Sequence, residues 1–348
     1  RPKRPTMTNA TAWVRIVIVN YNAGPLLQDC VEALARQTMP DFEAVIVDNA
    51  STEKPIADLR LPDARFSVLH AGRNAGFAAG SNLGASGATA PWIAMLNPDT
   101  RPLPDWLAEL RAATERYPWA ALFGSTQLLM QQPDLVDGFG DALSAYGTAW
   151  RSGNGRPSRD LPRGDCEVFS PCGAAALYAR DRFERLGGFD EAFFCYLEDV
   201  DLGFRARLMG ERCVQVRRAE ILHAASAVSG HLSAFSVFHS YRNRIWLFAK
   251  NAPWPLLLPI AALQSAASLI AVARPRARHY RRAALEGLWA GLKGLPHALR
   301  RRKAIQRGRS VPTFEIARML VWNPLRARPP GRVAVLRRLE RPAAEAYP

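Results

Sequence analysis

From position 13 to about position 120, short runs of β-branched and apolar residues alternate with segments whose apolar residues recur at helical spacing. The runs, which predict strands, are WVRIVIV, FEAVIVD, FSVLH and PWIAML. After the first run, Leu27, Cys30, Val31 and Leu34 recur with the period of a helix. Strands that are apolar almost throughout are typical of a parallel sheet covered on both faces, so this part predicts an α/β fold.

A polar cluster follows each of these predicted strands. The clusters are NYN (20–22), DNAS (48–51), HAGRNAGFAAGSN (70–82) and NPDT (97–100). Ligands of open α/β sheets bind at the carboxyl ends of the strands, so the four clusters together predict one binding site.

The pattern changes twice further along the chain. Residues 121–225 mix short strand-like pieces with a Gly/Pro/Arg-rich loop, RSGNGRPSRDLPRG, that we expect to be exposed. Beyond about position 233 the sequence is helical and basic. The expected divisions are an N-terminal tail (1–12), an α/β domain (13–230, with parts 13–120 and 121–230), a helical region (231–323) and a poorly packed Pro/Arg-rich tail (324–348).

Positive charge is concentrated at the C-terminal end. The 348 residues carry a net charge of +15, yet residues 241–348 alone hold 22 Lys and Arg against 4 Asp and Glu. Within them, 252–273 is uncharged, interrupted by prolines and flanked by arginines on both sides. We expect helices that lie on an anionic membrane surface, with a transmembrane span as the alternative. Nucleic-acid binding fits less well, because no nucleic-acid module is recognisable.

The five cysteines show no regular spacing and indicate no disulfide framework, as in a reducing cytosol. Cys166 and Cys172 are interpreted as buried small hydrophobic residues rather than zinc ligands.

Two motifs of the N-terminal part each allow two interpretations. The glycines of NAGFAAGSNLG would let the backbone approach an anion, or would serve a turn and close helix packing. Asp99 would hold a hard cation bridging two phosphates, or would cap a helix near Pro104 or form a turn with Thr100.

The segment FFCYLEDVDLGF (193–204) sets three carboxylates among apolar residues. Residues 198–209 predict a helix in which Glu198 or Asp201 can pair with Arg205. Asp199 faces away from Asp201, by about 200° in helical geometry. This separation predicts a structural role for Asp201 and a catalytic one for Asp199.

In order and spacing, these motifs resemble the nucleotide-sugar glycosyltransferases of family 2 over roughly residues 13–230. The motifs are VRIVIVNYN, AVIVDNAS, NAGFAAGSNLG, LNPD, GGFDEAFFCYLEDVDLGFRARLMG and ILHAAS. VNYN and NPD are most similar to the rhamnosyltransferase branch. The resemblance implies the GT-A fold, a Rossmann-like and mostly parallel sheet flanked by helices, to which a basic, membrane-associating helical extension is added.

The resemblance also implies a role for individual residues. Nucleotide-sugar binding is implied for Asn20, Tyr21, Asn22, Asp48, Asn49, Asn74, Gly76, Phe77, Gly80, Asn82 and Asn97. Asp99 and His223 would hold Mg²⁺ or Mn²⁺, although Asn97 stands where the family has an Asp, and His223 could instead be a hydrogen-bonded histidine at a strand end. Asp190 and Glu191 would face the acceptor, or form a turn with a helix cap.

For catalysis, the resemblance implies an inverting transfer with Asp199 as the general base and Glu198 as the second choice. Asp137 and Asp141 are interpreted as surface charges. The expected reaction moves L-rhamnose from dTDP-L-rhamnose to a lipid-linked or growing cell-envelope glycan, at the cytoplasmic face of a bacterial inner membrane. Transfer from a UDP-hexose or UDP-N-acetylhexosamine is an alternative, and a non-catalytic nucleotide-sugar-binding scaffold is a more remote one.

Overall fold

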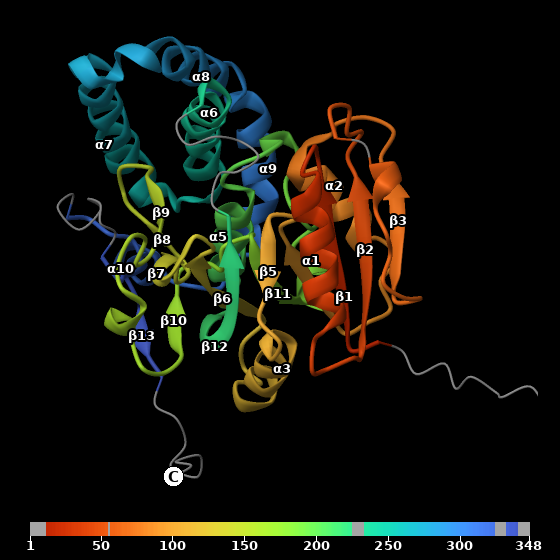
Figure 1. Ribbon diagram of the computed structural model, residues 1–348. Coiled ribbons are helices and arrows are strands. Elements are labelled where there is room, and N and C mark those ends of the chain that lie inside the picture. The colour runs from red at the N-terminus through yellow and green to blue at the C-terminus, as the bar shows by residue number, and fades with distance from the viewer. Residues whose placement is uncertain (1–11, 55, 225–232, 324–331, 340–348) are drawn as a thin grey trace, which may run out of the picture.

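The computed structural model describes residues 12–54, 56–224, 233–323 and 332–339. In these residues one large sheet has the strand order β13-β10-β12-β6-β11-β4-β1-β2-β3, and β5 and β7 pair with β12 and β6 (Figure 1). The strands are β1 (Val14–Asn20), β2 (Phe42–Asp48), β3 (Phe66–His70), β4 (Trp92–Leu96), β5 (Thr100–Pro102), β6 (Leu122–Leu129), β7 (Gln132–Gly138), β10 (Cys166–Val168), β11 (Ala175–Ala179), β12 (Cys213–His223) and β13 (Arg337–Arg338). A separate ribbon joins β8 (Asp141–Leu143) to β9 (Ala149–Arg151).

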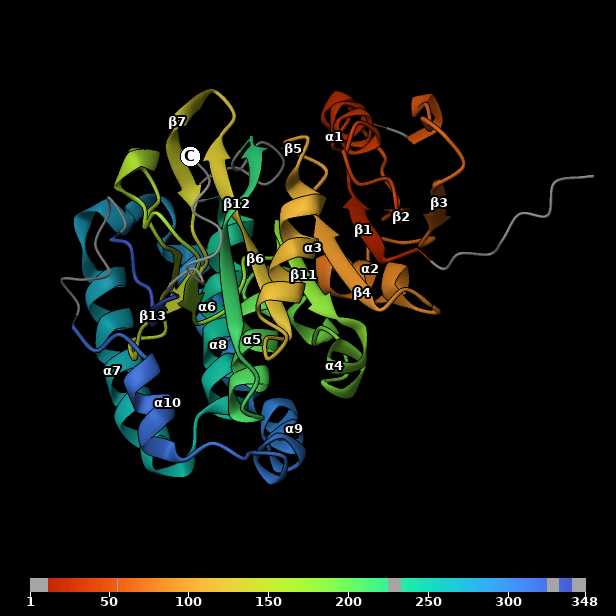
Figure 2. The same cartoon turned by 90° about the horizontal axis from the view of Figure 1, so that it is seen from below.

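The helices divide between the sheet and a C-terminal bundle. Beside the sheet lie α1 (Pro25–Ala35), α2 (Gly76–Ala85), α3 (Trp106–Arg116), α4 (Arg180–Arg185) and α5 (Glu198–Leu208). The C-terminal helices are α6 (Ala234–Asn251), α7 (Trp254–Ala273), α8 (Arg281–Lys293), α9 (Leu295–Arg307) and α10 (Thr313–Met319). Helices α6 to α9 gather at the end of the molecule away from β1–β3 (Figures 1 and 2).

The predicted N-terminal α/β unit is confirmed. Alternate residues of β1 serve two cores, because successive side chains of a strand point to opposite faces. Ile16 and Ile18 are buried in one core with residues of α1, and Val17 and Val19 in the other with residues of α2. Strands β1, β2 and β3 run parallel, which aligns Asn20 with Asp48.

Beyond β4, the expectation of a mostly parallel sheet is wrong. Strand β11 is antiparallel to both of its neighbours, β4 and β6, and only β6 and β12 are again parallel. A returning strand such as β11 needs no helical crossover, and the residues between β6 and β11 instead form short hairpins. The fold is a mixed α/β sheet.

Two expectations about loops also need correction. In the loop at 151–164, Ser152 and Leu161 are buried. Residues 332–339 of the tail pair with β10, where the Leu336 amide donates to the Glu167 carbonyl at 2.8 Å. The expectation of poor packing is wrong for this stretch, because an open strand edge takes up its backbone groups. Residues 324–331 and 340–348 lie outside the described part, as do residues 1–11 of the N-terminal tail.

Candidate active site

The ends of β1 and β2 bring the first two polar clusters together. The Asn20 amide donates to Ser51 Oγ at 3.0 Å and lies 3.5 Å from Asp48 Oδ1. The Asn49 amide donates to Asn74 Oδ1 at 3.0 Å, so the third cluster joins them. Asn20, Asp48 and Asn49 are at most 8% exposed. Tyr21 is 38% exposed, and Asn22 Oδ1 accepts from the backbone amide of Thr52. These hydrogen bonds connect the loops that follow β1, β2 and β3 along the same edge of the sheet.

The glycine-rich segment packs tightly as helix α2. A Cβ on Gly80 would lie 2.8 Å from a methyl of Val19, and one on Gly76, whose φ is +85°, would lie 2.4 Å from the carbonyl oxygen of Phe194. Phe77 packs in the same core as Phe189. Close packing therefore accounts for Gly80, while Gly76 lies where the start of α2 contacts Phe194, in the segment before α5.

Asn82 lies on α2 beside the 189–191 segment. Its side chain donates to the Phe189 carbonyl at 2.9 Å and to Glu191 Oε1 at 3.0 Å, and accepts from the Phe189 amide. Asp190 accepts from the Ala192 amide at 3.3 Å, which is a helix cap. These are structural hydrogen bonds. Nucleotide binding by Asn82 and acceptor contact by Asp190 and Glu191 stay predictions.

Asp99 and His223 meet at the carboxyl ends of β4 and β12. His223 Nε2 lies 3.3 Å from Asp99 Oδ1, and its Nδ1 lies 2.7 Å from Asp137 Oδ2. Arg151 forms an ion pair with the same oxygen, Asp137 Oδ2. Helix α3 begins at Trp106 after Asp105, so Asp99 does not cap it.

The electrostatics of this group depend on the two carboxylates. Burial disfavours the charged imidazole, but hydrogen bonds to Asp137 and Asp99 outweigh it and raise the pKa of His223 to about 9. A carboxylate and an imidazole nitrogen suit Mn²⁺ or Mg²⁺ that also binds diphosphate oxygens. Asp137 would fix the ring so that Nε2 points to the ion. The donor set therefore fits the expected cation. Asn97 precedes this group, and its backbone amide donates to the Ala174 carbonyl.

Asp199 is fixed at the first turn of α5. Its Oδ2 accepts from the Gly173 amide and its Oδ1 from the Val200 amide, both at 2.7 Å. Burial raises the pKa of Asp199 above its ordinary value, although these hydrogen bonds oppose the shift. On the opposite side of the helix, Asp201 pairs with Arg205 at 2.9 Å, which confirms that predicted ion pair.

Glu198, the second candidate base, is 6% exposed. Its Oε2 is buried and makes no hydrogen bond with the described residues. Burial, followed by the neighbouring charge of Asp199, raises the pKa of Glu198 well above its usual range. These surroundings favour a protonated Glu198.

The segment leading into α5 is strained and is held by α6. Phe194, Tyr196 and Leu197 have φ values of +63°, +70° and +68°, which side-chain-bearing residues rarely adopt. The amide nitrogen of Asn243 lies 3.0, 2.9 and 2.7 Å from the carbonyl oxygens of Phe193, Cys195 and Tyr196, so its two hydrogens are shared among three acceptors. One buried side chain of the helical region thus fixes three carbonyls immediately before Glu198.

A buried network of ion pairs is the second connection between the helical region and the segment around α5. Lys250, at the end of α6 and 1% exposed, pairs with Asp190 and lies 2.9 Å from Asp201. Arg301 of α9 pairs with Asp190 at 2.7 Å. From the sequence, the basic region was interpreted only as a membrane-binding surface. This interpretation missed the ion pairs of Lys250 and Arg301, because their acidic partners lie about 50 to 110 residues away in sequence.

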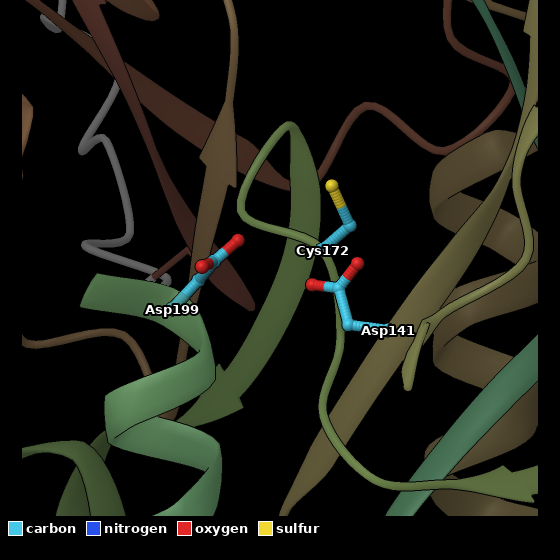
Figure 3. Close-up of side chains that lie close together, drawn as sticks. All are labelled: Asp141, Cys172 and Asp199. Carbon is cyan, nitrogen blue, oxygen red and sulfur yellow. The ribbon is translucent and has the colours of Figure 1, made fainter. Parts of the chain in front are cut away.

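The interpretation of Asp137 and Asp141 as surface charges is wrong, since they are 0% and 5% exposed. Asp137 holds His223 and Arg151. Asp141 lies beside Cys172 and Asp199, where the three side chains face one another (Figure 3). No local pattern separates these aspartates from exposed ones. The pairing of β7 with β6, and of β6 with β12, is what brings Asp137 to His223.

The arrangement of strands and helices is that of the GT-A fold. The complex of GalNAc-T7 with UDP, GalNAc and Mn²⁺ superposes with a TM-score of 0.61 at 14% identity, over 88% of this chain and 59% of the other. A mannosyltransferase of Pyrobaculum calidifontis, in complex with GDP-Man and Mn²⁺, gives 0.51 at 19% identity over 88% of both chains. At these identities the likeness concerns the fold.

Sequence comparisons narrow the class. The family model "Glycosyl transferase family 2" matches residues 15–187. The N-acetylglucosaminyl-diphospho-decaprenol L-rhamnosyltransferase of Mycobacterium tuberculosis is 30% identical over 273 residues, 69% of this chain and 85% of its own. An O-antigen biosynthesis protein of Myxococcus xanthus is 30% identical over 262 residues, 70% of this chain and 20% of that protein. The chain belongs to glycosyltransferase family 2 and is a glycosyltransferase similar to rhamnosyltransferases.

Proposed function

We propose that this glycosyltransferase moves L-rhamnose from dTDP-L-rhamnose to a lipid-linked cell-envelope glycan, with inversion at the anomeric carbon. The observation that carries the proposal is the 30% identity with the mycobacterial rhamnosyltransferase, which spans 85% of that enzyme. The acceptor hydroxyl attacks the anomeric carbon, and the bond from that carbon to the diphosphate oxygen breaks.

Asp199 takes the proton of the attacking hydroxyl. Three features support this role: its two oxygens are aimed by the amides of Gly173 and Val200, it lies at the start of α5, and burial raises its pKa. A positioned carboxylate of raised pKa is a better base than an exposed one. Glu198 is less suited, because no described group donates a hydrogen bond to its Oε2, so this oxygen is not held in a fixed direction as those of Asp199 are.

Asp99 and His223 would hold a divalent cation, which offsets the charge that develops on the leaving diphosphate. The chain's own contribution is to orient these ligands. Asp137 accepts from His223 Nδ1, which leaves Nε2 to face Asp99, and Arg151 holds Asp137 in turn. Asn20, Asp48, Asn49 and Asn74 line the edge where the nucleotide would lie, and their mutual hydrogen bonds reduce the ordering that binding requires.

The helices after α6 are proposed to lie on the membrane that carries the acceptor. Helix α7 is long and apolar enough to cross a membrane, and only 17% of its most apolar window is buried. Leu258, Leu269 and Ile270 are 77%, 71% and 57% exposed, and Trp289 of α8 is 60% exposed. Apolar side chains beside many arginines suit an anionic lipid surface, with the enzyme peripheral to it.

The test combines transfer with donor binding. Purified protein is supplied with dTDP-L-rhamnose, UDP-glucose or UDP-N-acetylglucosamine, a polyprenyl-diphosphate-linked sugar acceptor, and Mn²⁺ or Mg²⁺. We expect transfer from dTDP-L-rhamnose, and an Asp199→Asn variant with kcat lower by about 10²–10⁴-fold but an unchanged donor Kd by calorimetry. Transfer from a UDP-sugar alone would overturn the donor assignment, and near-normal kcat in Asp199→Asn would overturn the base.

A further inference from the structure

Asp141, Cys172 and Asp199 come from three separate elements and meet in one small volume. Asp141 begins β8, Cys172 lies in the turn before β11, and Asp199 is the second residue of α5. One ligand atom of each, a carboxylate oxygen or the sulfur, lies within 4.8 Å of the other two. Figure 3 shows the three side chains side by side, with the Asp199 carboxylate directed toward the other two.

Asp141 is the member whose position needs an explanation. It is 5% exposed, and the described residues form no hydrogen bond or ion pair with its carboxylate, although the charge of Arg151 lies close enough to oppose the rise in its pKa. An unpaired carboxylate is costly to bury. Consistent with this, burial and the charge of Asp199 raise the pKa of Asp141 well above its usual range. A buried polar group without a partner, aimed at two other ligand atoms, indicates a ligand that bridges them.

In place of the interpretation of Cys172 as a buried hydrophobic residue, we propose that Asp141, Cys172 and Asp199 form a binding site for a zinc-like cation, separate from the proposed site at Asp99 and His223. Zn²⁺ and Cd²⁺ bind thiolate together with carboxylates, and three protein ligands leave a fourth, tetrahedral position to water. Mg²⁺ and Mn²⁺ prefer oxygen ligands, so the sulfur favours the softer ions. The site at Asp99 and His223 would therefore prefer Mg²⁺ or Mn²⁺, and the site at Asp141, Cys172 and Asp199 would prefer Zn²⁺ or Cd²⁺.

The surroundings suit this site. The amides of Gly173 and Val200 each occupy one position on an Asp199 oxygen and fix the carboxylate, while each oxygen keeps a lone pair. Binding takes the proton from the Cys172 thiol, and any proton on the two carboxyl groups, and releases them to solvent. The three negative ligands then surround a dication, and Asp141 gains a direct ligand contact. The positive charge of Arg151, which acts on all three groups, opposes binding in part.

Occupation of this site has a consequence that depends on the proposed function. A cation bound to Asp199 takes up one of its two remaining lone pairs, and its positive charge makes the carboxylate a weaker base toward the acceptor hydroxyl. Zinc would then inhibit transfer while donor binding at Asp99 and His223 continues. Removal of the ion by a chelator would restore activity, because no covalent bond is made.

The test measures binding first, without any turnover. The full-length protein, reduced and freed of metal, is titrated with Cd²⁺ while the ultraviolet charge-transfer band of cadmium–thiolate is recorded. We expect a saturable band with one equivalent, which excess Mg²⁺ does not remove. Cys172→Ser should lose the band, whereas Cys166→Ser, a buried cysteine outside the cluster, should keep it. Asp141→Asn should raise the Cd²⁺ Kd by about tenfold or more.

Circular dichroism and thermal unfolding check that each variant is folded. A band that persists in Cys172→Ser, or a Kd unchanged in Asp141→Asn, would overturn the site. Transfer assays then add Zn²⁺ at saturating Mg²⁺: inhibition with unchanged KM for the donor, reversed by a chelator, is expected. Cadmium binding without any rhamnosyl transfer would reject the proposed function and leave the site standing, whereas transfer without cadmium binding would reject the site alone.

Discussion

The side-chain amide of Asn243 donates a hydrogen bond to the carbonyl of Tyr196 at 2.7 Å, so that α6 holds the strained segment entering α5. The same amide reaches the carbonyls of Phe193 and Cys195. Asn243 is 0% exposed, and it lies in the helical region rather than in the α/β domain. The position of Asp199 therefore depends on a helix that follows the family-matched residues 15–187.

Asn243→Asp keeps the size of the side chain but removes both N–H donors. We expect kcat to fall by about tenfold or more with a smaller change in donor KM, because the base moves while the nucleotide edge at β1 and β2 stays. Loss of buried hydrogen bonds should also lower the free energy of unfolding by about 1–3 kcal/mol. Steady-state kinetics and urea unfolding measure both, with Ser240→Ala on the same helix as the control. Equal loss of kcat and donor affinity would contradict a positioning role.

Asp137→Asn removes the carboxylate that orients His223. We expect the affinity for activating Mn²⁺ to fall by about 10–100-fold, because the imidazole loses the acceptor that fixes its tautomer and ring angle. The concentration of Mn²⁺ that gives half-maximal transfer measures it. Asp134→Asn, an exposed aspartate on the same strand β7, is the matched control and should leave this value unchanged. No difference between the two variants would refute the role of Asp137.

The network around Asp190 should make stability depend on pH. Burial alone would raise its pKa, but Lys250 and Arg301 outweigh it and lower the pKa of Asp190 to about 2. A folded-state pKa below the unfolded one stabilises the protein at neutral pH, here by about 2 kcal/mol, and the contribution is lost as pH falls from about 4 toward 2.

Urea unfolding of the wild type and Asp190→Asn at a series of pH values checks this expectation. The difference in unfolding free energy should be largest near neutrality and shrink by roughly 1 kcal/mol by pH 3. A difference that does not vary with pH would mean that the Asn variant loses packing rather than charge pairing.

Gly84 is where α2 approaches the sheet most closely. A Cβ there would lie 2.5 Å from a methyl of Val17 and 2.9 Å from a methyl of Val47. Gly84→Ala should therefore destabilise the fold by about 1–3 kcal/mol. The control is Gly308→Ala, where the nearest atom would be 3.7 Å away and little change is expected. Chemical unfolding distinguishes them, and equal stability of the two variants would show that α2 can shift.

The exposed apolar face of α7 should govern membrane binding. Replacing Leu258 and Leu269 together by Glu should reduce sedimentation with anionic phospholipid vesicles by about tenfold, because the face loses buried apolar area and gains repulsion. Leu61→Glu, an exposed leucine before β3 that is far from α7, serves as the control. Undiminished binding of the double variant would place the lipid contact elsewhere.

Some of the site could be predicted because its signals are local. The strands of the N-terminal unit, the polar clusters at their ends and the Asp201–Arg205 pair each lie within one element or one βα unit. The positions of Asp137, Asp141 and Asn243 could not, since each depends on partners that lie 31 to 86 residues away in sequence.

The sequence by itself determined the α/β alternation, the family resemblance and the carboxylates at the start of α5, because periodicity and motif spacing are properties of neighbouring residues. The tertiary structure alone decided the direction of β11 and the burial of Asp137 and Asp141. It also decided that Asn243 of α6 forms hydrogen bonds with the segment before Asp199. These features arise from contacts between distant segments, whose free energy depends on which groups meet after folding rather than on any local preference.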